Sequence, residues 1–265
     1  MTNKNIFSMK ILLSLPCFIL ASVLFWTMTT EQGIGETYIN RTRLIFSQKA
    51  NDESLSIINE GAKPALMQLW IDKEEPEEKP EHIYVPFVVL PPVARLEPKS
   101  SLGIRVLFTG KGPSLTADSE SLFWLNVLEV PPKMPVSEDN PVLQMAIRTR
   151  IKICYRPNAL GDITSSDAVK KLHFSYVKDS NKSRLQIENR SPLYVTLTQI
   201  KYGEAHWENN LPHDGMIAPF SHISLPVIQF TDSRQLSMTV RYIDDYGVIS
   251  EYHPAELNET VAIVQ

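Results

Sequence analysis

The chain has 265 residues, of which 43% are hydrophobic, and its formal net charge is −4 at pH 7. Positive and negative charges are mixed along the sequence, which excludes the basic field of a nucleic-acid-binding protein, so we expect no nucleic-acid partner. Only two cysteines are present, and one lies in the N-terminal segment. Core burial, not disulfide bonds, must therefore hold the fold.

The N-terminal segment is typical of a targeting signal. Two lysines precede an uncharged apolar run, residues 11–26, that contains a helix-breaking proline, Pro16. We assign residues 1–30 to a secretory signal peptide, with cleavage between residues 27 and 35. A retained single-span anchor is the alternative, because the run is close to the roughly 17 residues that can cross a bilayer.

Beyond residue 38, short β-rich runs alternate with turn residues. In the first half, strands are predicted at residues 42–46, 54–58, 65–71, 85–90, 103–108 and 122–127. This spacing is typical of an antiparallel β-sandwich. We place the first domain at residues 35–157.

The longest predicted strand lies within residues 141–157. Its apolar positions are Leu143, Met145, Ile147, Ile151 and Ile153, and its polar positions include Gln144, Arg148, Arg150 and Lys152. This period-two pattern predicts a strand with one buried face. Because strands usually have about five or six residues, we expect this one to outreach its neighbours and to leave unpaired backbone groups that recruit another extended chain. Cys154, in the same strand, is expected to be a small buried residue.

The second half repeats the pattern of the first. Residues 158–170 are polar and lack periodicity, which predicts a linker. Strands are then predicted at residues 172–177, 183–188, 194–200, 221–227 and 236–242. We place the second domain at residues 171–265. The fold class is therefore all-β, with two β-sandwich domains in tandem.

The sequence lacks the motifs of catalysis. It contains no G-x-S-x-G, no H-E-x-x-H, no phosphate-binding glycine loop and no C-x-x-C, and its six histidines show no metal-ligand spacing. We therefore predict that the protein is not an enzyme, with no catalytic residue, no metal site and no cofactor.

Several segments together resemble one family. They are residues 40–46, 91–98, 120–126, 129–132, 151–157, 191–196 and 242–247. In this order they are similar to the periplasmic pilus (fimbrial) assembly chaperones of the chaperone-usher pathway, and the short loop after Pro132 resembles that family's short-loop class. The resemblance implies two immunoglobulin-like domains in an L or boomerang arrangement. It also implies periplasmic localisation and donor-strand complementation, in which the chaperone's strand completes an unfinished subunit fold.

The resemblance also assigns a role to the apolar side of the long strand. Leu143, Met145 and Ile147 match the side chains that the family inserts into the subunit's groove. Periodicity alone favours the alternative that they belong to the chaperone's own core. The family pattern favours insertion.

Two cations match the family's anchor for the subunit's terminal carboxylate. They are Arg43 and Lys152. Ordinary exposed strand charges are the alternative, since Arg41, Arg148 and Arg150 lie nearby. Lys152 has the opposite parity from the three apolar residues, so the strand must use both faces, twist or bulge.

Three further charges, Glu120, Arg156 and Asp245, match the family's interdomain ionic network, to which we assign a structural role. The resemblance implies two partners, pilus subunits and the outer-membrane usher, and the exposed edge strand would also permit weak self-association. Two other classes remain open. A two-domain surface adhesin or fimbrial structural protein would carry its own donor extension, and an exported hydrolase would need a nucleophile or a metal site.

Overall fold

The computed structural model describes residues 37–73, 83–133, 144–178, 183–203, 205–227, 238–254 and 258–260. The predicted signal peptide and Leu143 lie outside these residues. Within the described ranges, no helix combines the length and the apolar character that a membrane crossing needs.

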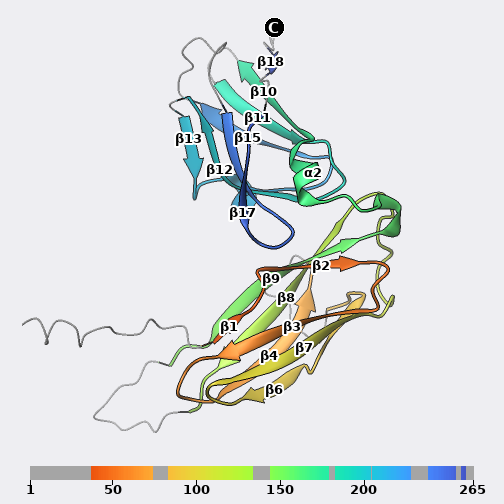
Figure 1. Ribbon diagram of the computed structural model, residues 1–265, viewed down its shortest axis with the longest axis vertical. Helices are drawn as coiled ribbons and strands as arrows, with labels where there is room; N and C mark the ends of the chain where they lie inside the picture. The colour runs from red at the N-terminus through yellow and green to blue at the C-terminus, as the bar shows by residue number, and fades with distance from the viewer. Residues whose placement is uncertain are drawn as a thin grey trace, which may run out of the picture. The chain divides into compact units, whose positions relative to one another are not determined.

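The chain folds into two β-sandwiches, which confirms the predicted all-β fold class (Figure 1). The first contains β1 (Thr37–Ile39), β2 (Arg43–Ser47), β3 (Asp52–Asn59), β4 (Ala65–Asp72), β5 (Phe87–Leu90), β6 (Val93–Leu96), β7 (Ser100–Phe108), β8 (Ser121–Val130) and β9 (Ile147–Arg156). The second contains β10 (Leu172–Lys178), β11 (Ser183–Asn189), β12 (Val195–Tyr202), β13 (Ala205–Glu208), β14 (Met216–Ile217), β15 (His222–Val227), β16 (Met238–Ile243), β17 (Ile249–Tyr252) and β18 (Asn258–Thr260).

Each sandwich pairs a four-stranded sheet with a five-stranded sheet. In the first, the strand orders are β1-β3-β7-β5 and β2-β9-β8-β4-β6. In the second, they are β15-β11-β10-β18 and β13-β12-β16-β17, with β14 paired to β12. Most pairs are antiparallel, but β2 runs parallel to β9.

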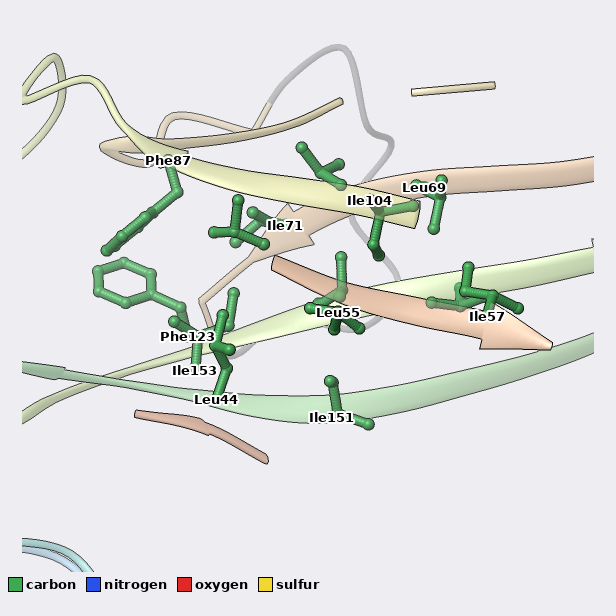
Figure 2. Packing of buried hydrophobic residues seen from close by; sticks show 14 of the residues in the cluster. Leu44, Leu55, Ile57, Leu69, Ile71, Phe87, Ile104, Phe123, Ile151 and Ile153 are labelled. Carbon is green, nitrogen blue, oxygen red and sulfur yellow. The ribbon is translucent and has the colours of Figure 1, made fainter. Parts of the chain in front are cut away.

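Alternating apolar residues from both sheets fill the first core, as Figure 2 shows. Phe87 packs against other aromatic rings in this core, with its ring centroid 5.2 Å from that of Phe46 and 4.9 Å from that of Phe123, both at edge-on angles. Such aromatic pairs add about 0.5–1.5 kcal/mol to the effect of burial. Cys154 is also buried, as predicted, and burial raises the pKa of its thiol, so it is a packing residue.

The segment expected to be a linker has structure of its own. Residues 158–160 form the 3-10 helix η2, and α2 spans Ser165–Val169. The Thr164 side chain and Asp167 form a capping box at the start of α2. Ala168 and Val169 are buried in the second core, so the end of the expected linker belongs to the second sandwich.

Strand β9 is paired on one side along its length and on the other side only in part. It pairs with β8 from Ile147 to Tyr155, but with β2 only from Lys152 to Arg156. The chain crosses between sheets just before β2, because β1 pairs with β3 in the opposite sheet. Among the described residues, therefore, no strand covers the β2 side of residues 147–151.

A buried asparagine ends equivalent strands in the two sandwiches. Asn59 closes β3, where its amide nitrogen donates to Lys63 O at 2.9 Å and its side-chain oxygen accepts from the Gly61 N–H at 2.8 Å. Asn189 closes β11, and its amide nitrogen donates to the carbonyls of Leu193, Ile217 and Ala218. Each side chain thus forms hydrogen bonds with backbone groups that are not paired within a sheet.

We predict that Asn189→Ala destabilises the protein by about 2–4 kcal/mol, because it leaves buried carbonyls without donors. Chemical denaturation followed by circular dichroism measures this loss. The matched control is Asn210→Ala, at an exposed position, for which we expect a change within about 0.5 kcal/mol. Equal stability of the two variants would show that the buried amide is dispensable.

Candidate functional site

The open edge of β9 carries exposed apolar side chains. Ile147 is 44% exposed, and Met145, just before the strand, is 59% exposed. On the same face farther along the strand, Ile151 and Ile153 are buried in the core. The strand therefore extends past its own core, and its apolar face becomes exposed at that point.

The register of β9 settles the parity problem raised by the sequence. The β8–β9 pairing is continuous from Ser121↔Tyr155 to Glu129↔Ile147. No bulge separates Ile147 from Lys152, so the strand uses both of its faces: the apolar residues point to the core side and Lys152 to the outer side.

Arg43 and Lys152 are direct neighbours on that outer side, at the start of the β2–β9 pairing. Arg43 is only 8% exposed, and its Nη1 donates to Ile243 O at 3.4 Å. Lys152 Nζ donates to Thr196 Oγ1 at 3.1 Å. Both acceptors are neutral and belong to the second sandwich. Among the described residues, neither cation forms an ion pair.

This arrangement favours an anionic ligand. Burial lowers the pKa of Lys152, and the nearby charge of Arg43 lowers it further. The buried Nε atoms of Arg43 and of Arg150 have no hydrogen-bond partner within the described structure. A carboxylate placed between the two cations would relieve their repulsion and satisfy the free donors.

A hairpin of the second sandwich borders the cation pair. It connects β16 to β17, and Gly247 at its tip has a φ of +83°. A Cβ atom at Gly247 would lie 2.1 Å from Thr42 Oγ1, so this close approach, next to Arg43, requires glycine. Thr42 therefore contacts Gly247, and the next residue, Arg43, donates to the carbonyl of Ile243 at the end of β16.

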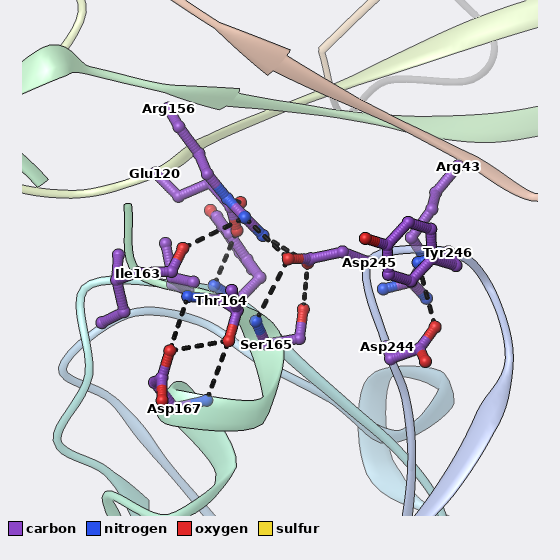
Figure 3. Close-up of polar contacts among 12 residues, drawn as sticks. Arg43, Glu120, Arg156, Ile163, Thr164, Ser165, Asp167, Asp244, Asp245 and Tyr246 are labelled. Atoms are coloured by element: carbon purple, nitrogen blue, oxygen red, sulfur yellow. Dashed lines mark hydrogen bonds and ion pairs between the residues drawn. The ribbon is translucent and has the colours of Figure 1, made fainter. Parts of the chain in front are cut away.

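The three charges predicted to form an ionic network do meet (Figure 3). Arg156 Nε donates to Glu120 Oε1 at 2.8 Å, and its two terminal nitrogens donate to the two oxygens of Asp245 at 2.9 and 2.6 Å. Glu120 also accepts from the Tyr194 N–H at 2.9 Å, and Asp245 accepts from the Ser165 hydroxyl. The network thus links β9 and the residue that precedes β8 to the second sandwich.

The pKa values of this network reflect burial and pairing. Burial raises the pKa of Glu120, although Arg156 opposes the effect. Burial acts in the same direction on Asp245, but the hydrogen bonds from Arg156 and Ser165 outweigh it and lower the pKa of Asp245. Burial acts to lower the pKa of Arg156, yet its carboxylate partners prevail and raise it. The guanidinium therefore stays charged and holds both carboxylates.

Sequence reasoning missed residues that support the site. Thr196 is buried in the second sandwich and accepts from Lys152, and Ser165 opens α2. Trp124 lies opposite Lys152, with its ring centroid 5.7 Å from the ammonium. Arg150, grouped with ordinary surface charges by its sequence, is held 2.6 Å from the buried Asp72. In the sequence, only the alternation of polar and apolar residues along β9 pointed to these contacts.

Among the described residues, no group of His, Cys, Asp or Glu side chains could hold a metal ion.

Comparison with known proteins agrees with this architecture. The family model for the pili and flagellar-assembly chaperone PapD N-terminal domain matches residues 36–161, and that for the pili assembly chaperone PapD C-terminal domain matches residues 167–254. The chain is 38% identical over 221 residues to the chaperone protein FimB/FhaD of Bordetella pertussis, covering 82% of this chain and 86% of that protein. It is 33% identical over 210 residues to the chaperone protein PapD of Escherichia coli, covering 79% and 82% respectively.

A solved structure supports the same assignment. The CupB2 chaperone of Pseudomonas aeruginosa superposes with a TM-score of 0.66 at 29% identity, over 82% of this chain and 99% of that chain. Both sandwiches are thus matched in sequence and in fold, and the chain belongs to the PapD family of pili assembly chaperones.

Proposed function

We propose that this chaperone binds a pilus subunit along the open edge of β9, completes the subunit's fold with that strand and delivers it to an outer-membrane usher. The half-paired state of β9 carries the proposal, because residues 147–151 offer backbone groups to an incoming strand. Main-chain hydrogen bonds would supply affinity, and alternate side chains would supply specificity.

The exposed apolar side chains fit the role of inserted residues. Met145 and Ile147 are exposed, which disfavours the alternative that they fill the chaperone's own core. Burying each in a subunit groove is worth roughly 1.5–3 kcal/mol before ordering costs. Leu143 lies outside the described residues, and its assignment remains a prediction from parity and family resemblance.

The position of the cations sets the direction of the bound strand. The apolar residues precede Lys152 along β9, so a subunit strand that ends at Lys152 must run parallel to β9. It would lie in line with β2, which is also parallel to β9 and begins at Arg43. The start of β2 therefore stops the subunit strand where its carboxylate reaches Arg43 and Lys152.

The ionic network around Arg156 has a different role in this proposal. Its charges are already paired, and breaking a buried pair is strongly destabilising. It joins β9 to the second sandwich, which supplies Thr196 and the Ile243 carbonyl to the cation pair. Glu120, Arg156 and Asp245 thus keep those acceptors in place.

We infer that the protein acts in the periplasm after its N-terminal segment has directed export. The signal-like sequence of residues 1–30 and membership of the PapD family support this inference. The open edge would also permit weak self-association when no subunit is bound. No residue is assigned to usher binding.

We predict that Arg43→Ala and Lys152→Ala each weaken subunit binding by about 30-fold or more, because each removes charge-assisted hydrogen bonds to the buried carboxylate. The measurement uses a pilus subunit that this chaperone binds and a synthetic peptide of that subunit's C-terminal strand. The peptide is made both with a free carboxylate and as the amide, and binding is followed by calorimetry.

The amide peptide should lose no affinity in either variant, since it brings no anion for the cations to bind. Arg105→Ala is the matched control, because Arg105 is an exposed strand arginine in the opposite sheet. If the folded anchor variants bind the carboxylate peptide as tightly as the wild type does, the anchor assignment is wrong.

We also predict that affinity for the carboxylate peptide falls with rising pH, starting below the ordinary lysine pKa of about 10.4. Binding an anion raises the pKa of Lys152. Peptide affinity is therefore highest at pH values below the pKa that Lys152 has in the unbound protein, and it declines as pH rises through that pKa. Lys152→Arg keeps its charge and should show no such decline. Identical pH profiles for the two proteins would contradict the role of Lys152.

A further inference from the structure

The outer face of the five-stranded sheet carries two cross-strand rows of polar and aromatic side chains. The first row follows the register Arg43–Lys152–Trp124–Asp72, and the second follows Arg150–Asn126–Trp70. Three cations of β2 and β9 therefore lie close together on one face. They differ in how their charges are compensated.

Arg150 is held by a buried carboxylate. Its Nη2 donates to Asp72 Oδ1 at 2.6 Å, and Asn126 Nδ2 donates to the other oxygen of Asp72 at 2.8 Å. Asp72 is 1% exposed and Asn126 is fully buried. The guanidinium also lies 4.7 Å from the centroid of the Trp124 ring. In contrast, the cation pair of Arg43 and Lys152 contacts only neutral acceptors among the described residues.

This difference matters because a bound strand could pair with β9 in a register that is shifted by two residues. Arg150 lies two residues before Lys152, on the same face of the same strand. A one-residue slip of a bound strand would reverse its faces, but a two-residue slip would not. The apolar side chains would still point into a groove, and the subunit's carboxylate would then lie beside Arg150. The start of β2 prevents a slip only in the other direction.

We propose that Asp72, positioned by Asn126, sequesters Arg150 and so keeps it from competing with Arg43 and Lys152 for the subunit's carboxylate. A subunit that stopped two residues short would have to displace Asp72 and leave it buried without its cation. Asp72 is therefore a register-determining residue that does not itself touch the subunit. The inference rests on the proposed carboxylate anchor.

Asp72→Asn tests this directly, because asparagine keeps the shape of the side chain and removes the charge that holds Arg150. The readout is disulfide cross-linking from Ile147→Cys to the subunit's C-terminal peptide, which carries one cysteine at either of two positions two residues apart. Cys154 is buried and does not compete.

With Asp72 intact, we expect one of the two peptides to cross-link. With Asp72→Asn, both should cross-link, and adding Arg150→Gln should restore the single register. Asp52→Asn, which breaks the exposed Asp52–Arg105 pair of the opposite sheet, is the matched control and should leave the single register unchanged. A single, unchanged register in folded Asp72→Asn would overturn the inference.

A second measurement leaves Asp72 in place and does not depend on the folding of its variant. In Arg43→Gln/Lys152→Gln, a sequestered Arg150 predicts equal affinity for the carboxylate and amide peptides. A carboxylate preference that remains in this variant and disappears when Arg150→Gln is added would show that Arg150 is accessible. That result would overturn this inference and leave the carboxylate anchor intact. If the wild type itself shows no preference, the carboxylate anchor is wrong and this inference falls with it.

Discussion

The half-paired strand β9 is the constraint on which the rest of the structure depends. From Lys152 onward, β9 lies between β8 and β2, so this part of the strand is fixed from both sides. Before Lys152, β8 is the one described strand that pairs with it. The chain produces this asymmetry by placing β1 and β2 in opposite sheets, which leaves the N-terminal half of β9 uncovered among the described residues. The result is an edge that is open and yet anchored at one end, which suits the recruitment of an extended chain.

The electrostatics of the same sheet separate structural cations from binding cations. Arg150 and Arg156 are compensated by buried carboxylates, whereas Arg43 and Lys152 contact neutral oxygen atoms of the second sandwich. Neutral acceptors orient a cation without cancelling its charge. At the end of the open edge, Arg43 and Lys152 are thus largely buried cations whose described hydrogen-bond acceptors are neutral.

The sequence predicted the all-β fold and the grouping of Glu120, Arg156 and Asp245 because alternation and family motifs are local signals. It also predicted that β9 would outreach its neighbours, but β9 has ten residues, as β8 has. It could not separate Ile147 from Ile151, which have the same parity, because exposure depends on where the core ends. Nor could it distinguish Arg150 from Lys152. Their difference comes from Asp72, which is 78 positions from Arg150 in the chain and meets it only through the β4–β8–β9 register.

The most direct test of the central claim is backbone hydrogen exchange of β9 with and without the subunit's C-terminal peptide. Amides of residues 147–151 that point to the open edge should become protected on binding, because a parallel strand would accept their hydrogen bonds. Amides of residues 152–156, already enclosed by β8 and β2, should change little. Saturated binding without any gain of protection in residues 147–151 would contradict the claim that the subunit pairs with this edge.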